Sequence, residues 1–371
     1  MTMDRRRFLR NLLVSGAAVP ALSACGGGSS GSSTTPGGDQ PMLGGERRLR
    51  FLAIGDTGTG GAGQTYVAKA MEQVMAAQGA DFVLVTGDNL YEEGATSVAD
   101  KGFLDKFELP YQNIDLPFFL CLGNHDNACT PLGGGSCNKR GDYQVEYHYS
   151  EQRYSRKWNM PDRYYTQAFG GTPEQPFMEL FVVDSNPLTS FYDDPDPAYS
   201  WQNFGEPQRK LMQQWVHSSR AHWKIAMSHV PYVSNGKHGN AGNLDDGLRW
   251  LFTGKNADGR QYKHFLESCF ANQADMLFTG HDHNMQWLEP RPALGPAEII
   301  LTGAGAKTDS IKDAKRNPVR FQQGGQCGFV WVELYEEKMW VQFYNVDPKK
   351  GHYELAYEQV CAKPIMAPAL A

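Results

Sequence analysis

The sequence predicts an α/β fold in which two packed β-sheets, with mixed parallel and antiparallel strands, are flanked by helices. Two observations carry this prediction. Up to about residue 270, apolar runs of strand length alternate with segments whose apolar residues recur at helical spacing. Beyond residue 283, the apolar runs follow one another without helices between them. The alternation predicts parallel strands, and the later run predicts a second, largely antiparallel sheet packed on the first.

The first part of the chain supplies the alternating elements. We expect strands at residues 49–54, 82–85, 118–122, 178–183, 223–227 and 276–278, and helices at 64–78, 101–107, 207–220 and 262–270. Residues 127–170 are polar, rich in Gly and Tyr and without a clear period. This stretch therefore predicts an irregular excursion from the sheet.

The second part supplies strands alone. We expect these at residues 298–302, 329–334, 339–344 and 353–357. No internal repeat or linker interrupts the chain, so residues 46–362 are expected to form one domain, with 363–371 as a C-terminal tail. A chain of 371 residues that is 41% apolar has enough material for a substantial core.

Residues 1–24 predict an export signal. Arg6 and Arg7 form a twin arginine before Phe8, and the apolar run 12–22 that follows is too short to cross a bilayer of roughly 30 Å. The signal ends in Leu-Ser-Ala before Cys25, which resembles the lipobox of bacterial lipoproteins. The alternative is an ordinary cleaved signal with a chance cysteine. We expect a periplasmic or otherwise extracytoplasmic protein, anchored to a membrane by a lipid on Cys25 and a flexible Gly/Ser tether at 25–45.

Charge and cysteine content limit the partners and the disulfides. The net charge of -6 and a pI near 5.9 give no basic footprint for nucleic acid. Cys129 and Cys137 bracket a seven-residue loop and would be able to close a disulfide after export. Cys121 lies in an apolar run, which favours a buried thiol. The other three cysteines of the domain cannot be paired from the sequence.

Five short motifs carry side chains that bind metals. Each follows an apolar run, and together they supply carboxylate, phenolate, amide and imidazole groups on loops after strands, where α/β folds place their chemistry. The motifs are Gly55-Asp56-Thr57-Gly58, Gly87-Asp88-Asn89-Leu90-Tyr91, Gly123-Asn124-His125-Asp126, Ser228-His229-Val230-Pro231 and Gly280-His281-Asp282-His283. This ligand set suits two adjacent metal ions.

A dinucleotide site is the competing interpretation of the first loop. Residues 58–63 satisfy the G-x-G-x-x-G pattern between a predicted strand and a predicted helix. Asp56, however, precedes the glycines and would direct a carboxylate toward a pyrophosphate. The remaining loops also supply His and Asn ligands that nicotinamide chemistry does not need.

The two aspartates favour cations. Asp56 and Asp88 are expected to end neighbouring strands, so their carboxylates approach each other and repel unless cations lie between them. His281 and His283 alternate around Asp282, which lets both imidazoles reach adjacent metals. A glycine before Asp56, Asp88, Asn124 and His281 allows the backbone to turn tightly.

These motifs, in this order, resemble the purple acid phosphatases, in particular the small tartrate-resistant type. The resemblance spans residues 47–346 and includes the stretches 156–161 and 301–305. Tyr91 is its most specific mark, because most other dinuclear metallophosphoesterases lack a phenolate there. The resemblance implies the metallophosphoesterase-type α/β/β/α sandwich and an acid phosphatase that acts on small phosphorylated substrates.

The resemblance also implies a role for each motif residue. Fe(III) would be bound by Asp56, Asp88, Tyr91 and His283. A divalent ion (Fe, Zn or Mn) would be bound by Asp88 as a bridge, Asn124, His229 and His281. A hydroxide held by the metals would attack phosphorus, His125 would contact the phosphoryl oxygens, and His238, nine residues after His229, would protonate the leaving group.

Two other functions remain open at this point: a phosphodiesterase or nucleotide-processing metallohydrolase, and a non-catalytic lipoprotein that binds metal or phosphate. The chain departs from the small family members at Asn127, in the insert 129–140 and in the loop 185–205. These departures surround the expected cleft, so they leave the substrate undetermined. The sequence also leaves the divalent metal and the oligomeric state open.

Overall fold

The computed structural model describes residues 47–131, 133–190, 192–244, 254–255 and 257–366. The expected export signal, the lipid site at Cys25 and the tether lie outside the described residues, and they stay predictions. None of the helices in the described part of the chain combines the length and the apolar character needed to cross a membrane.

The first sheet has seven strands in the order β14-β13-β12-β1-β2-β3-β4. Four of them pair in parallel: β1 (Arg47–Ile54), β2 (Phe82–Val85), β3 (Phe118–Leu120) and β4 (Trp158–Asn159). Three antiparallel strands extend the sheet beyond β1: β12 (Cys327–Tyr335), β13 (Lys338–Val346) and β14 (Tyr353–Ala362).

The second sheet also has seven strands, in the order β11-β9-β10-β8-β7-β6-β5. Its parallel centre consists of β6 (Pro176–Val182), β7 (Trp223–Met227), β8 (Met276–Thr279) and β10 (Glu298–Thr302). Antiparallel strands flank this centre: β5 (Tyr165–Gly171), β9 (Met285–Leu288) and β11 (Val319–Gln323).

The predicted fold class is confirmed, but the division of strands between the sheets is not as expected. The strands beyond residue 283 do not form a sheet of their own. β9, β10 and β11 join β8 in the second sheet, and β12 to β14 complete the free edge of β1 in the first. An apolar run shows that a segment is a strand, but its partner is chosen by long-range packing. Both sheets are consequently mixed.

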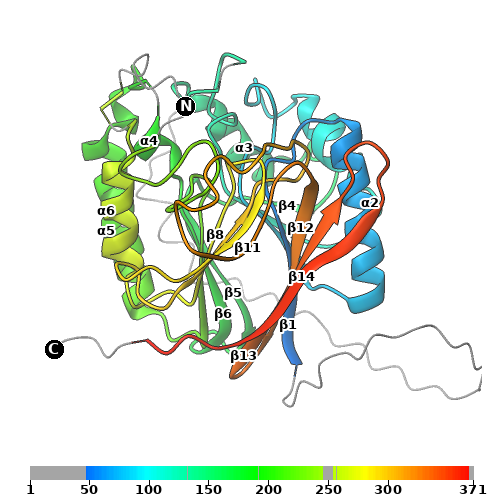
Figure 1. The fold of residues 1–371 in the computed structure, drawn as a ribbon. Helices are drawn as coiled ribbons and strands as arrows, with labels where there is room; N and C mark the ends of the chain where they lie inside the picture. The colour runs from blue at the N-terminus through cyan, green and yellow to red at the C-terminus, as the bar shows by residue number, and fades with distance from the viewer. Residues whose placement is uncertain (1–46, 132, 191, 245–253, 256, 367–371) are drawn as a thin grey trace, which may run out of the picture. The chain divides into compact units, whose positions relative to one another are not determined.

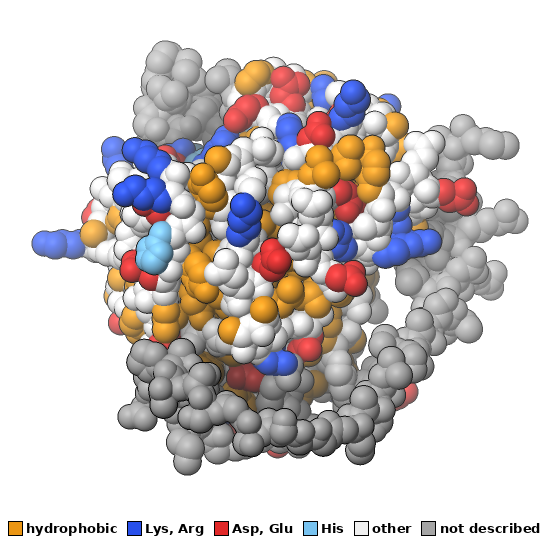
Figure 2. All heavy atoms as spheres, turned by 90° about the vertical axis from the view of Figure 1, so that its right-hand side faces the viewer, with side chains coloured by type: hydrophobic (Ala, Val, Ile, Leu, Met, Phe, Trp, Pro, Cys, Tyr) orange, Lys and Arg blue, Asp and Glu red, His pale blue; other side chains and the backbone are white. Residues whose placement is uncertain are grey.

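Helices cover the outer faces of the pair of sheets (Figure 1). α2 (Ala62–Gln78) lies against β12 and β13 of the first sheet. α5 (Glu206–Ser218) and α6 (Arg260–Phe270) contact each other and bury Met212, Phe265 and Leu266 in a core with β6, β8 and β10. The remaining helical segments are short: Leu104–Glu108, α3 (Lys139–Tyr149), α4 (Asn186–Thr189), Pro197–Tyr199 and Trp201–Gly205. The face that includes α2 carries interspersed positive and negative side chains (Figure 2).

The expectation that residues 127–170 are irregular is wrong in part, because they contain α3, β4 and the start of β5. α3 escaped detection for a physical reason. Its buried positions are Gly141, Gln144 and Tyr147, so it presents no apolar stripe at helical spacing. The buried face of this helix is largely polar, and a search for apolar residues at helical spacing does not detect a helix of that kind.

Aromatic side chains join the two sheets. Phe51 of β1 meets Phe278 of β8 edge to face, with ring centroids 5.8 Å apart. Trp287 of β9 stacks on Phe343 of β13 at 6.0 Å. Since these residues are buried, the interior between the sheets is a packed core. The carboxyl ends of β1, β2, β3, β7 and β8 meet at one edge of this core, and the five motifs begin there.

Candidate metal centre

The five motif loops are connected to one another directly. Asp56 donates its N–H to the carbonyl of Gly87 at 2.9 Å, Gly280 donates to the carbonyl of His229 at 2.9 Å, and His281 donates its N–H to Oδ2 of Asp56 at 2.9 Å. Asp56 and Asp88 follow β1 and β2, which are neighbouring parallel strands, as expected from the sequence. The loops therefore bring residues far apart in sequence into one site.

One group of candidate ligands consists of Asp56, Tyr91 and His283. The Tyr91 hydroxyl donates to Oδ1 of Asp56 at 3.0 Å and lies 3.1 Å from Nε2 of His283. That imidazole nitrogen is also 3.6 Å from Oδ1 of Asp56. Asp56 is completely buried and Tyr91 nearly so.

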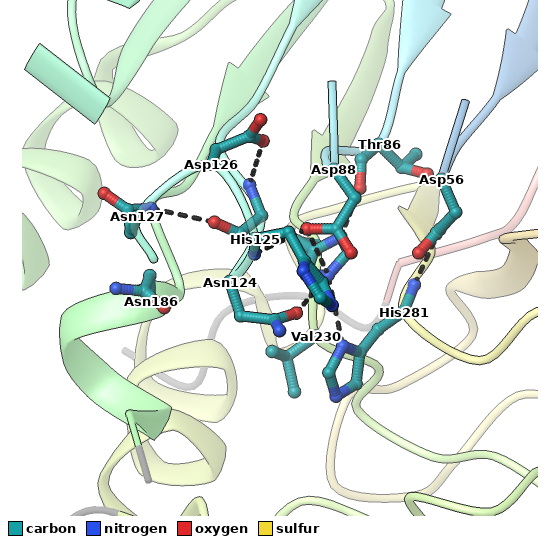
Figure 3. Close-up of polar contacts among 12 residues, drawn as sticks. Asp56, Thr86, Asp88, Asn124, His125, Asp126, Asn127, Asn186, Val230 and His281 are labelled. Carbon is teal, nitrogen blue, oxygen red and sulfur yellow. Dashed lines mark hydrogen bonds and ion pairs between the residues drawn. The ribbon is translucent and has the colours of Figure 1, made fainter. Parts of the chain in front are cut away.

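A second group consists of Asn124, His229 and His281. Nε2 of His229 lies 2.9 Å from Oδ1 of Asn124 and 3.1 Å from Nδ1 of His281. Oδ1 of Asp88 is 3.5 Å from the same nitrogen. In Figure 3 the side chains of Asp88, Asn124 and His281 point toward a common space.

Asp88 lies between the two groups. Ligand atoms of Asp56, Asp88 and His229 are all within 4.8 Å of one another. The three residues come from both groups, so the two sets of ligands are adjacent. All seven metal ligands expected from the sequence are thus gathered at one place.

The chemistry of the second group fits a bound cation. Nδ1 of His229 is 2.8 Å from the carbonyl of Thr86, and since a carbonyl only accepts, this nitrogen carries the proton. Burial lowers the pKa of His229, so the ring is neutral and Nε2 presents a lone pair. That lone pair faces the oxygen atoms of Asn124 and Asp88. Electron-pair donors that face one another without a proton between them are stabilised by a metal ion.

The first group fits a cation for electrostatic reasons. Burial and then the neighbouring charge of Asp88 raise the pKa of Asp56 well above its ordinary value. Burial, followed by the charges of Asp56 and Asp88, raises the pKa of Tyr91 well above its ordinary value. Two buried carboxylates and a phenolate become compatible only when positive charge is placed among them.

The two predicted catalytic histidines lie beside the ligands. His125 donates its main-chain N–H to Oδ1 of Asp88 at 2.9 Å, and its Nδ1 lies 2.6 Å from the carbonyl of Glu92. The ring of His238 packs on that of His281, with centroids 3.9 Å apart and planes 32° apart. Both histidines are partly exposed, whereas His229 and His281 are buried.

Asp309 also belongs to the site, although no sequence pattern predicted it. Its Oδ2 is 3.2 Å from Nδ1 of His283 and 2.8 Å from Nζ of Lys237. A carboxylate on the far nitrogen of a ligand histidine fixes the tautomer and the ring orientation. Asp309 follows His283 by 26 residues in an irregular loop, so no local pattern identifies it.

Asp126 is the last residue of the third motif, but no function was predicted for it from the sequence. Its buried carboxylate accepts hydrogen bonds from the main-chain N–H groups of Asn89, Leu90 and Gly123 and from the side chain of Gln144. Burial and the charge of Asp88 raise its pKa to about 7. Asp126 therefore holds the loop that carries Asp88 and Tyr91.

The departures from the small phosphatases form a connected structure next to the site. The predicted disulfide between Cys129 and Cys137 is present, with an S–S distance of 2.02 Å, and Cys121 is a buried free thiol as expected. Asn127 does not face the site, because Oδ1 of Asn127 accepts from the buried Arg163 at 2.6 Å. A Cβ added at Gly133 would lie 2.7 Å from Nδ2 of Asn124 and 3.0 Å from Nε2 of His125, so the disulfide loop touches both residues.

The glycine-rich loop at residues 58–63 has a structural explanation. A Cβ on Gly58 would lie 2.0 Å from the carbonyl oxygen of Asn89, and a Cβ on Gly63 would lie 2.6 Å from that of Ala306. Gly58 permits the close approach of backbone that brings the Asp56 and Asp88 loops together, and Gly63 permits the close approach of the backbone at Ala306. The packing accounts for them without a dinucleotide.

Comparison with known proteins gives a consistent result. Residues 49–285 match the family described as Calcineurin-like phosphoesterase. The chain is 27% identical over 312 residues to Purple acid phosphatase 3 of Arabidopsis thaliana, which covers 80% of this chain and 75% of that protein. It is 27% identical to Tartrate-resistant acid phosphatase type 5 of Sus scrofa, over 81% of this chain and 84% of that protein.

Solved structures share the fold. GAP50, described as the anchor in the inner membrane complex of Plasmodium, has a TM-score of 0.64 at 22% identity, covering 87% of this chain and 90% of that one. The purple acid phosphatase PPD1 from yellow lupin (Lupinus luteus) seeds has a TM-score of 0.56 at 15% identity, covering 85% of this chain and 54% of that one.

Proposed function

The chain belongs to the calcineurin-like phosphoesterase family, and from this premise we propose that it is a phosphatase that hydrolyses phosphate monoesters with two bound metal ions. The single observation that supports the proposal best is the pair of adjacent ligand groups that meet at Asp88. The similarity to purple and tartrate-resistant acid phosphatases supports the same class of enzyme.

The residues present suggest two unlike metal ions. Asp56, Asp88, Tyr91 and His283 would hold Fe(III), because anionic oxygen ligands suit a hard trivalent ion. Asn124, His229 and His281, together with Asp88, would hold a divalent Fe, Zn or Mn ion through mostly neutral ligands. When bound, two such ions supply Lewis acidity and lower the pKa of water.

His125 is proposed to orient the phosphoryl group. Its Nδ1 contacts the carbonyl of Glu92 at 2.6 Å, which directs Nε2 away from Glu92 and toward Gly133 and Asn124. Its backbone N–H is fixed by Asp88. A histidine held through both its ring and its backbone, next to a candidate ligand, is suited to positioning substrate oxygens rather than to binding metal.

His238 is proposed to protonate the leaving group. It lies against the ring of His281 in the second ligand group, and it remains partly exposed where an ester oxygen could reach it. A positioned acid typically accelerates such a step by about 100- to 10,000-fold. The acceleration matters for alkyl esters, because an alkoxide is a poor leaving group.

The proposal is tested by comparing substrates. Metal-loaded protein is assayed with p-nitrophenyl phosphate and with bis(p-nitrophenyl) phosphate. We expect the monoester to be hydrolysed with the higher kcat/KM, and a preference for the diester would replace the proposal with a phosphodiesterase. If metal-replete protein turns over neither, a binding role replaces it.

Variants connect the activity to the site. Asp88→Asn should abolish turnover, because Asp88 is shared by both ligand groups. His264→Ala, which changes an exposed histidine on α6, serves as a control and should keep wild-type activity. Equal activity in wild type and Asp88→Asn would disconnect the enzyme from this cluster.

We further propose that the protein is exported and held at a membrane by a lipid on Cys25, in keeping with the twin arginine and the tether in the sequence. A phosphatase in that location would act on small phosphate esters outside the cytoplasm.

A further inference from the structure

We infer that Asp282 is a positioning residue for His238, an inference that rests on the function proposed above. Asp282 stands between two candidate ligands, His281 and His283, but among the described residues no hydrogen bond or ion pair joins its carboxylate to either imidazole. Oδ2 of Asp282 accepts a hydrogen bond from the hydroxyl of Ser234 at 2.5 Å, and Oδ1 accepts one from the main-chain N–H of His238 at 3.1 Å. The carboxylate thus binds the loop that carries His238.

The loop is wrapped tightly around this carboxylate. A Cβ on Gly236 would lie 2.3 Å from Cγ of Asp282, so only glycine fits there. Ser234 accepts hydrogen bonds from the N–H of Gly236 at 2.8 Å and from Nε2 of Gln286 at 3.0 Å. Both acceptor positions of its oxygen are then filled, and its one proton is directed to Asp282.

The same turn fixes the ring of His238 relative to the metal ligands. His238 packs on His281, the residue directly before Asp282. The main chain of His238 is therefore held by Asp282, and its ring is held by the neighbour of Asp282. A displacement of the carboxylate would shift His238 against the ligand group, while His281 keeps its own anchor on Oδ2 of Asp56.

The charge of Asp282 points to function rather than to packing alone. Asp282 is completely buried, and among the described residues no Lys, Arg or His forms an ion pair with it. Its partners are neutral N–H and O–H donors. A buried carboxylate without a cation is costly, and such groups concentrate at functional sites. Its proximity also adds to the negative potential at Asp56.

The substitution Asp282→Asn tests the inference with little change in shape. Asparagine has one oxygen where aspartate has two, so it cannot accept from both Ser234 and His238 in the present geometry. Its amide would instead face a hydroxyl whose acceptor positions are occupied. One of the two anchors of the loop is lost.

The measurement is kcat/KM of the metal-loaded enzyme for an alkyl phosphate, glycerol 2-phosphate, and for p-nitrophenyl phosphate. We expect Asp282→Asn to lower the alkyl value roughly 10- to 100-fold, because small displacements of a positioned acid are costly, and the aryl value less than about threefold. Asp105→Asn, an exposed carboxylate away from the loop, is the matched control and should change neither value.

Two further readouts separate positioning from general damage. In the double variant Asp282→Asn/His238→Ala, the alkyl value should be no lower than in His238→Ala alone, because the two residues act through one group. The metal content of Asp282→Asn should equal that of wild type, and the variant should remain folded at the assay temperature. Ser234→Ala should reproduce the selectivity more weakly and provides a second route to the test if Asp282→Asn fails to fold.

The possible results are distinct. Equal losses on both substrates, additive losses in the double variant, or loss of metal would each overturn the inference for Asp282. If His238→Ala itself affects the two substrates equally, the acid role of His238 falls, and the role of Asp282 falls with it. If His238→Ala is selective and Asp282→Asn is not, the proposed function stands and only the positioning role is refuted.

Discussion

Arg163 supports the structure beside the metal centre, and its replacement by methionine should destabilise the protein strongly. Arg163 is 6% exposed, and its guanidinium donates from Nε to Oδ2 of Asp184 at 2.8 Å. It also donates to the carbonyl of Asn138 at 2.7 Å and to Oδ1 of Asn127 at 2.6 Å. It thereby connects the segment after His125 to the end of β6.

The magnitude follows from what is left behind. Asp184 is completely buried, and Arg163 is the cation paired with it among the described residues. Removing one partner of a buried ion pair typically costs about 3–5 kcal/mol, because the other charge stays buried without compensation. Methionine fills much of the same space, so a cavity contributes little. For a domain of this size the loss corresponds to a decrease of about 4 to 8 °C in the unfolding temperature.

The assay is thermal unfolding at fixed protein and metal concentration, since bound metal alone shifts the midpoint. Arg209→Met is the matched control. Arg209 pairs with Glu206 three residues away on the surface of α5, and such pairs contribute about 0–1 kcal/mol. A decrease for Arg163→Met no larger than for Arg209→Met would refute the reasoning, because it would mean that Asp184 loses nothing when its charge partner is removed.

Three further predictions concern the site and its location. Metal analysis of active protein should give two ions per chain, about 3–4 Å apart as in two-metal sites generally; at most one ion, with no gain in activity on adding divalent metal, would contradict this. Iron-loaded protein should be purple or pink through a Tyr91-to-Fe(III) charge-transfer band that Tyr91→Phe removes; a colourless wild-type protein, or an unchanged band in the variant, would refute the assignment. Cys25→Ser should release the protein from membranes while export continues, as followed by fractionation and by incorporation of labelled fatty acid; membrane retention of the variant would point to another anchor.

The candidate metal ligands stand out in the sequence because their signals are local. Asp56, Asp88, Asn124, His229 and His281 each stand a few residues after an apolar run, and the ends of β1, β2, β3, β7 and β8 meet at one edge of the core. A ligand must also be one of a few residue types. Position and chemistry together therefore single out candidate ligands from the sequence alone.

The residues that position these ligands were not predictable in the same way. Asp309 and Thr86 contact His283 and His229 through the nitrogen atoms that face away from the ligand cluster, and a main-chain carbonyl such as that of Thr86 leaves no mark in the sequence. The pairing of β12 with β1 and the polar helix α3 were missed for a related reason. Both depend on contacts between segments far apart in the chain.

Backbone strain at the ligands shows what the site costs the fold. The described residues contain four non-glycine residues with positive φ, and three of them are candidate ligands: Asp56 at 58°, Asp88 at 53° and His281 at 70°. Each residue held in this region costs the fold about 1–3 kcal/mol. The strain coincides with buried carboxylates that repel each other.

Strain and repulsion together imply that metal binding and stability are linked. The hydrogen bonds from Asp56 to Gly87 and from His281 to Asp56 hold the strained loops in place, but they do not remove the repulsion between Asp56 and Asp88. Only cations do so, and binding them to the folded chain stabilises it by an amount that rises with the logarithm of their concentration relative to Kd. The fold therefore sets the geometry of the candidate ligands, and bound metal would complete the site by removing the repulsion between them.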